Sequence, residues 1–156
     1  GLFTALTFIK KNKMKKFSLL LTLYLFYGTV LYAQGSVFNT QIYNSEYDIF
    51  MELNLYEEKI KIPGQDILGK VYGYLKKTTD SRVWIVMDVN ISNDGKSARI
   101  EMVNDYGSED LVASLSVGEN GVYVLKQLEG SALKVAGKGK WIKLPKILEF
   151  VVKEKK

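Results

Sequence analysis

The sequence predicts an all-β domain, a single antiparallel β-barrel or β-sandwich of about eight or nine strands, mostly a meander of hairpins, behind an N-terminal signal helix. Three observations favour this fold class. Turn-forming residues recur at short and fairly even intervals, and the segments between them alternate between apolar and polar side chains. No segment of the predicted domain shows a sustained helical pattern.

Turn signals punctuate the chain after residue 40. Asn120-Gly121 is the sharpest, because both residues tolerate a positive φ, as a type I′ hairpin turn requires, and apolar runs flank them. Gly69 and Gly73 interrupt a strand pattern, which indicates a sharp bend or a close approach of the backbone. The turn signals are Asn44-Ser45, Pro63-Gly64, Thr79-Asp80-Ser81, Asn93-Asp94-Gly95, Tyr106-Gly107-Ser108, Asn120-Gly121, Gly130-Ser131 and Gly137-Lys138-Gly139.

Alternation with a period of two residues predicts which side chains of each strand face the core. Segments 140–144 and 146–152 also have an extended pattern, with Pro145 as a break between them, and a helix over 147–155 is the competing interpretation. The expected inward residues are Tyr47, Ile49, Met51, Leu53 and Leu55 in one strand, Val83, Ile85, Met87, Val89 and Ile91 in another, then Ala98, Ile100 and Met102, and finally Leu111, Ala113, Leu115 and Val117.

The start of the chain has the three parts of a secretory signal. Met14 begins a short cationic stretch, residues 17–32 form an apolar run, and Ala33 is a small residue before the polar Gln34. We therefore expect a signal peptide over 14–33, cleaved before Gln34, and export of 34–156 to the periplasm or out of the cell. An uncleaved run would be a membrane anchor and the only membrane contact that we expect. Residues 1–13 are interpreted as an upstream extension of the reading frame or an artefact.

Charge and composition exclude several classes of function. Of the 22 basic residues, five precede Gln34, so that 17 basic residues balance the 17 acidic residues of the expected mature domain. A neutral surface exerts no general attraction on phosphates, so we expect no nucleic-acid partner. The chain has no histidine and no cysteine, which removes imidazole-based metal sites, nucleophiles that need a histidine base, disulfides and lipid anchoring through cysteine.

Three local patterns resemble known sites and are interpreted as ordinary structure. Ser131 and Lys134 match S-x-x-K, but a strand would point them to opposite faces, and the partner motifs are missing. The stretch that begins at Asp88 has Asn93 and Arg99 where a calcium loop needs glycine at its sixth position and glutamate at its twelfth. Asn104, Asp105, Glu109 and Asp110 gather oxygen atoms near one turn, as polar hairpin loops commonly do. We therefore predict no catalytic residue, no metal site and no cofactor.

Aromatic residues are the remaining candidates for contact with a ligand or partner: Tyr72 and Tyr74 on one strand face, Trp84, Tyr106 and Trp141. Trp141 lies among lysines, as exposed aromatics of sugar or protein contact surfaces do. The competing interpretation is that a strongly curved sheet buries part of both its faces, these aromatics included.

The leading functional expectation is a non-enzymatic protein that binds a small apolar molecule inside a barrel, a lipocalin-like role, although the Gly-x-Trp of a lipocalin first strand is absent near 37–43. The alternative is an interaction or structural module of the cell envelope that contacts protein or glycan through surface aromatics. A carboxylate-based hydrolase is the least favoured class, because no pair among the 17 acidic residues is singled out.

Overall fold

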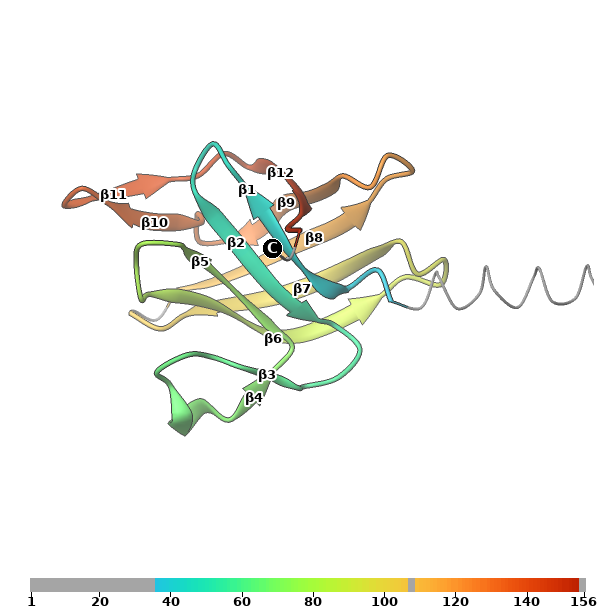
Figure 1. The fold of residues 1–156 in the computed structure, drawn as a ribbon, viewed down its shortest axis with the longest axis horizontal. Coiled ribbons are helices and arrows are strands. Elements are labelled where there is room, and N and C mark those ends of the chain that lie inside the picture. Colours follow the sequence, from blue (N-terminus) through green and yellow to red (C-terminus); the bar gives the residue numbers. More distant parts are fainter. Residues whose placement is uncertain (1–35, 107–108, 155–156) are drawn as a thin grey trace, which may run out of the picture. The chain divides into compact units, whose positions relative to one another are not determined.

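The structure, a computed structural model, describes residues 36–106 and 109–154 (Figure 1). The predicted signal peptide over 14–33 and the preceding residues 1–13 lie outside the described residues, so cleavage and export stay predictions. Within the described ranges, no helix is long and apolar enough to cross a membrane.

Eight strands close into an antiparallel barrel in the order β1-β12-β9-β8-β7-β6-β5-β2 (Figure 1). This result confirms the all-β prediction and decides for a barrel against a sandwich. The helix considered over 147–155 is wrong for the residues of the last strand. The bounds are β1 (Asn39–Asn44), β2 (Ile49–Asn54), β5 (Gly73–Lys77), β6 (Val83–Ile91), β7 (Ser97–Asn104), β8 (Asp110–Val117), β9 (Tyr123–Gly130) and β12 (Ile147–Val152).

Two short hairpins stand outside the barrel ladder. The first pairs β3 (Ile60–Lys61) with β4 (Lys70–Val71) and has the 3-10 turn η1 (Asp66–Leu68) at its tip. The second pairs β10 (Lys134–Gly137) with β11 (Lys140–Lys143) and lies within the connection from β9 to β12. In Figure 1 this second hairpin projects from the barrel at the upper left.

Apolar side chains fill the inside of the barrel. The predicted inward positions of β2, β7 and β8 are buried there, apart from Val117, which is half-buried and packs against the same core, and this confirms the alternation in these strands. Because interiors are packed to nearly crystalline density, side chains without exposed surface leave little room for a ligand among them. The fully inaccessible members of this cluster are Phe38, Ile42, Ile49, Met51, Leu53, Leu75, Val86, Ile100, Met102, Ala113, Leu115, Leu125 and Leu133.

The prediction of which side chains face the core is wrong for the first half of β6. Trp84 and Val86 point into the main core, and the register against β7 shifts between Val86 and Asp88. This β-bulge leaves Met87 with 51% of its surface exposed. Beyond it the parity reverses, so that the predicted residues of the second half pack against the core. A bulge adds one residue to one strand, and a strict period of two cannot anticipate it.

The outer face of β6 is apolar because the β3–β4 hairpin covers part of the barrel wall. Val83 and Ile85 belong to a second buried cluster with Ile62, Val71 and Tyr74. Both faces of this strand are therefore buried at one end, as a pattern without polar alternation indicates. The β3–β4 hairpin, and not sheet curvature alone, buries the outer face of β6 at this end.

The hairpin turns differ from the expected types. Asn120 has no positive φ, whereas Gly121 has a φ of 75°, and the amide of Gly121 donates to the carbonyl of Gly118. This is a three-residue loop with a glycine in the left-handed region, so the type I′ prediction at Asn120-Gly121 is wrong. Two consecutive positive φ values occur instead at Lys138 and Gly139, which connect β10 to β11.

Gly73 is a test of the barrel's packing. A Cβ atom at this position would lie 2.5 Å from the carbonyl oxygen of Glu52, which is backbone of the neighbouring strand β2. We expect Gly73→Ala to lower the free energy of unfolding by about 1–3 kcal/mol, because the strands must separate to admit the methyl group. Gly118→Ala is the control, since its Cβ would meet only the movable side chain of Asn120. Equal urea midpoints for the two variants would contradict this account of Gly73.

Candidate functional site

The connection from β9 to β12 folds over one end of the barrel and closes it. Leu133, Val135 and Leu144, at the base of the β10–β11 hairpin, are buried in the main core. The amide of Leu144 donates to the carbonyl of Leu133 at 2.9 Å, and the side chain of Gln127 accepts from the amide of Leu133 at 2.9 Å. The base of the hairpin is thus part of the core, whereas every residue of β11 is exposed.

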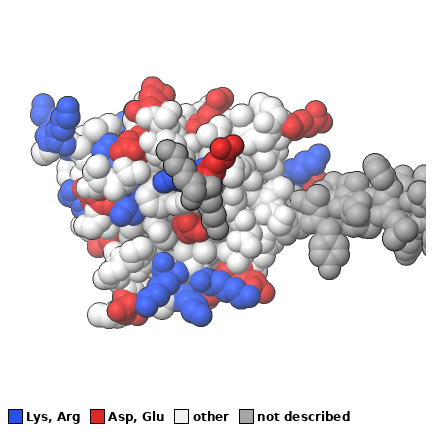
Figure 2. All heavy atoms as spheres, viewed as in Figure 1, with Lys and Arg blue, Asp and Glu red and all other residues white. Residues whose placement is uncertain are grey.

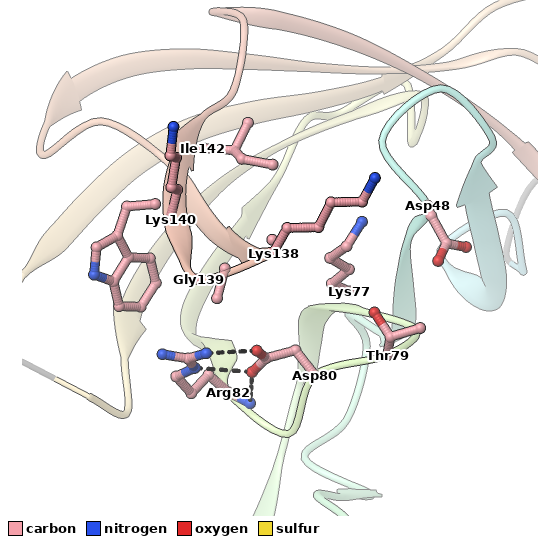
Figure 3. Close-up of a pocket in the computed structure, with 12 residues that line it drawn as sticks. Asp48, Lys77, Thr79, Asp80, Arg82, Lys138, Gly139, Lys140 and Ile142 are labelled. Atoms are coloured by element: carbon pink, nitrogen blue, oxygen red, sulfur yellow. Dashed lines mark hydrogen bonds and ion pairs between the residues drawn. The ribbon is translucent and has the colours of Figure 1, made fainter.

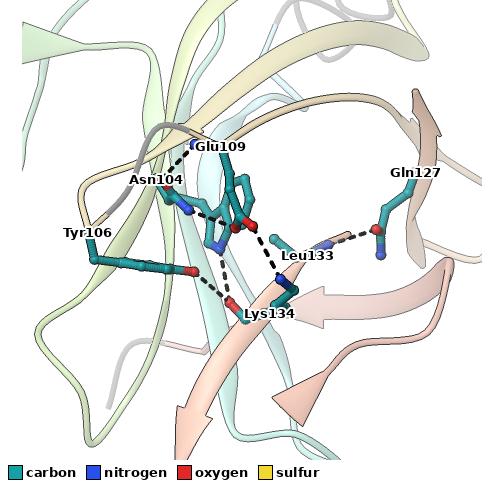
Figure 4. A network of polar contacts seen from close by, with 7 residues as sticks. Asn104, Tyr106, Glu109, Gln127, Leu133 and Lys134 are labelled. Carbon is teal, nitrogen blue, oxygen red and sulfur yellow. Dashed lines mark hydrogen bonds and ion pairs between the residues drawn. The ribbon is translucent and has the colours of Figure 1, made fainter. Parts of the chain in front are cut away.

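A single carbonyl oxygen fixes the position of β10. The carbonyl of Lys134 accepts hydrogen bonds from the indole Nε1 of Trp84 at 2.9 Å and from the hydroxyl of Tyr106 at 3.0 Å (Figure 4). The ammonium of the same lysine lies 3.2 Å from the carboxylate of Glu109, which also accepts from the amide group of Asn104 at 3.0 Å. Burial raises the pKa of Tyr106, which keeps its hydroxyl protonated and able to donate.

Three of the predicted aromatic residues meet at this point. The rings of Tyr106 and Trp141 stack with centroids 4.6 Å apart, and Trp84 contacts Tyr106 edge-on at 6.3 Å. The guanidinium of Arg82 lies 4.7 Å from the centre of the Trp141 ring. Trp84 is 1% exposed and Trp141 is 49% exposed, so the stack runs from the core to the surface.

A groove of about 740 Å³ separates the β10–β11 hairpin from the turns at the same end of the barrel. One wall is formed by residues 136–142 of the hairpin, and the other by Asp48 and the turn between β5 and β6 (Figure 3). On the far side of Trp141, a smaller hollow is lined by Tyr106, Glu109 and Lys134. The half-exposed tryptophan therefore borders both hollows.

The two carboxylates of the groove are already engaged. Asp80 accepts two hydrogen bonds from the side chain of Arg82, at 2.9 and 2.6 Å, and a third from its backbone amide. These bonds lower the pKa of Asp80 from its usual 3.8 to about 2. Asp48 accepts from the hydroxyls of Thr78 and Tyr43, which lowers the pKa of that carboxyl too.

Tyr72 and Tyr74 lie elsewhere. The chain bends at Tyr72, between β4 and β5, so the two residues do not share a face as alternation predicts. Tyr72 packs against the main core, whereas Tyr74 is buried in the outer cluster and contacts Phe50 edge-on. Neither lines the groove.

The groove contains residues that sequence reasoning missed, above all Arg82 and Lys77. Asp80 and Arg82 flank Ser81 in the predicted turn and form an ion pair. The sequence could have indicated this pair, because an acidic residue and an arginine stand two positions apart in a turn. The convergence of this turn with a hairpin more than 50 residues later has no local signature.

The described residues contain no group of three or more acidic side chains placed to hold a metal ion. The carboxylate of Glu109, one of the oxygen-bearing groups singled out in the sequence, instead pairs with the ammonium of Lys134 and accepts a hydrogen bond from the side-chain amide of Asn104. Comparison of the chain with protein-family models, with curated proteins and with solved structures gives no match.

The ion pair predicts a pH effect at acidic pH. Because the folded-state pKa of Asp80 is lowered, the pair stabilises the fold above about pH 4, and this contribution is lost as the pH falls towards 2. Arg82→Gln should return the pKa of Asp80 towards 3.8, as measured by carboxyl NMR titration. Lys76→Gln is the control and should shift this pKa less, since Lys76 acts only through its charge. An unchanged value in Arg82→Gln would contradict the assignment.

Proposed function

We propose that the domain is an exported, non-enzymatic binding module that contacts glycan in the groove between the β10–β11 hairpin and the turn between β5 and β6. The observation that carries this proposal is the half-exposed Trp141 at the edge of a groove of about 740 Å³. This volume lies in the usual range of ligand sites, about 300–1,000 Å³. Export rests on the predicted signal peptide over 14–33.

The groove has more support as the binding site than the inside of the barrel. An apolar carrier needs an interior cavity, but the core positions are occupied by side chains such as Phe38, Met51 and Trp84, each with at most 1% of its surface exposed. The base of the β10–β11 hairpin also covers one end of the barrel. A small apolar ligand would have to displace packed side chains, which costs free energy.

Glycan fits the lining better than a protein partner does. The centre of a protein interface is depleted of charged residues, whereas charged side chains form most of one wall of this groove and Lys138 and Lys140 contribute to the other. Sugar hydroxyls both donate and accept, so they match ammonium and hydroxyl groups arranged around a hollow. The aromatic edge of Trp141 adds one apolar contact to this polar set.

The groove gives little support to acid–base catalysis. A general acid needs a raised pKa near the working pH, but the pKa values of Asp48 and Asp80 are both lowered. Both carboxylates also accept hydrogen bonds from neighbouring side chains, which leaves neither directed at a reacting atom. We therefore favour binding over hydrolysis.

Calorimetric titration with dextran, xylan and polygalacturonate tests the proposal. We expect the full chain to bind at least one of the three, and Trp141→Ala to weaken that binding about tenfold, because the aromatic contact at the groove is lost. Leu128→Ala is the control, since Leu128 is also a large exposed apolar residue but lies on β9, outside the groove. Absence of binding to all three, or binding that Trp141→Ala leaves unchanged, would contradict the proposal.

A further inference from the structure

Basic side chains outnumber acidic ones in the groove. Lys77, Arg82, Lys138 and Lys140 line it together with only Asp48 and Asp80. The guanidinium of Arg82 is paired with Asp80. Lys77 lies close enough to Asp48 for their charges to attract, although the two form no direct ion pair. Lys138 and Lys140 form no ion pair among the described residues, so the groove keeps positive charge that is available to a ligand.

The groove has this excess of positive charge although the domain as a whole is neutral, with 17 basic and 17 acidic residues after position 33. In Figure 2, acidic and basic side chains are interspersed over much of the visible face. Basic ones gather at the upper left, where the tip of the β10–β11 hairpin lies in Figure 1, and in a larger group along the lower edge. A hollow lined by one sign of charge focuses the electric field and raises the local concentration of counter-charged ligands.

Lys138 lies at the tip of the β10–β11 hairpin. Its φ of 47° lies in the left-handed region, as a two-residue type I′ turn requires of both its central residues. The turn thus places the side chain of Lys138 at the end of the hairpin that borders the groove. Figure 3 shows the Lys138 side chain extending into the groove towards Lys77.

Lys77 faces the hairpin from the other wall. Its ammonium donates to the carbonyl of Tyr47 at 3.0 Å, which fixes the side chain without neutralising its charge. An ammonium on each wall and a third on Lys140 suit a ligand with several separated negative charges. The guanidinium of Arg82 is occupied by Asp80 on its fork and by Trp141 on its face, so its role is to position Trp141.

We propose that the groove binds an acidic glycan, a saccharide chain with repeated carboxylate groups, with Lys77, Lys138 and Lys140 as the anion-binding residues. This inference rests on the proposed function and adds the charge of the ligand to it. A glycan is favoured over an acidic peptide because the hydroxyl of Thr79 and the exposed edge of Trp141 line the groove beside the lysines, and sugar hydroxyls and ring faces can use both. Attraction between point charges implies that binding weakens as salt increases.

The test uses two probes with the same backbone: polygalacturonate and its methyl-esterified form, in which the carboxylates are neutralised. Binding to the full chain is measured by quenching of tryptophan fluorescence, to which the exposed Trp141 responds more than the buried Trp84. We expect the acidic form to bind about tenfold more tightly than the ester, and about 0.5 M NaCl to remove most of the difference.

Lys138→Gln and Lys77→Gln should each weaken the binding of polygalacturonate by about tenfold, the loss expected for one charge-assisted hydrogen bond. Lys126→Gln is the matched control, because it removes the same charge from an exposed position on β9 outside the groove, and it should leave binding unchanged. Far-ultraviolet circular dichroism checks that each variant retains the strand content of the parent.

The outcomes separate the two proposals. Equal binding of the acid and the ester, or lysine variants that bind like Lys126→Gln, would overturn the acidic-glycan inference and leave the glycan proposal standing. Binding of poly-glutamate without binding of either polysaccharide would overturn the glycan proposal itself. The combination of acid preference and loss in both groove variants supports both.

Discussion

The hydrogen bonds that converge on the carbonyl oxygen of Lys134 hold together the end of the barrel that carries the groove. Trp84 belongs to β6, Tyr106 to the turn after β7, and Lys134 to the hairpin between β9 and β12, so three separate segments meet at one acceptor. Both hydrogen bonds are partly shielded from water, and each contributes about 0.5–1.5 kcal/mol, so together they favour this position of the hairpin. The β10–β11 hairpin is consequently held in one position against the barrel, where Trp141 of β11 stacks on Tyr106.

The position of the hairpin explains how a filled barrel acquires a groove on its outside. A barrel of eight strands has an interior that side chains just fill, and here they do, so the proposed ligand site lies outside the barrel. The β10–β11 hairpin supplies the missing wall: its base joins the core, and its exposed part faces the turn between β5 and β6 across the groove. The ion pair of Asp80 with Arg82 then ties the opposite wall to the face of Trp141.

Sequence patterns predict the strands and the core of this molecule better than they predict its candidate site. Alternation placed Ile100 and Leu115 in the core correctly. Their strands have one apolar and one polar face, and a shift of register by one residue would turn the apolar face to solvent. It failed at Met87, where a bulge reverses the parity, and at Tyr72, where a bend separates two strands. Trp84, Tyr106 and Trp141 were singled out as aromatics, but their contact depends on long-range packing that no local pattern records.

A double-mutant cycle on Trp84→Phe and Tyr106→Phe tests most directly whether the Lys134 carbonyl holds this end of the barrel. Each single variant leaves the carbonyl one donor, whereas the double variant leaves it none. We therefore predict that the double variant loses about 1 kcal/mol more unfolding free energy than the two single losses together, and that the amides of β10 exchange with solvent faster in it. Strictly additive losses with unchanged exchange in β10 would contradict the central role of this acceptor.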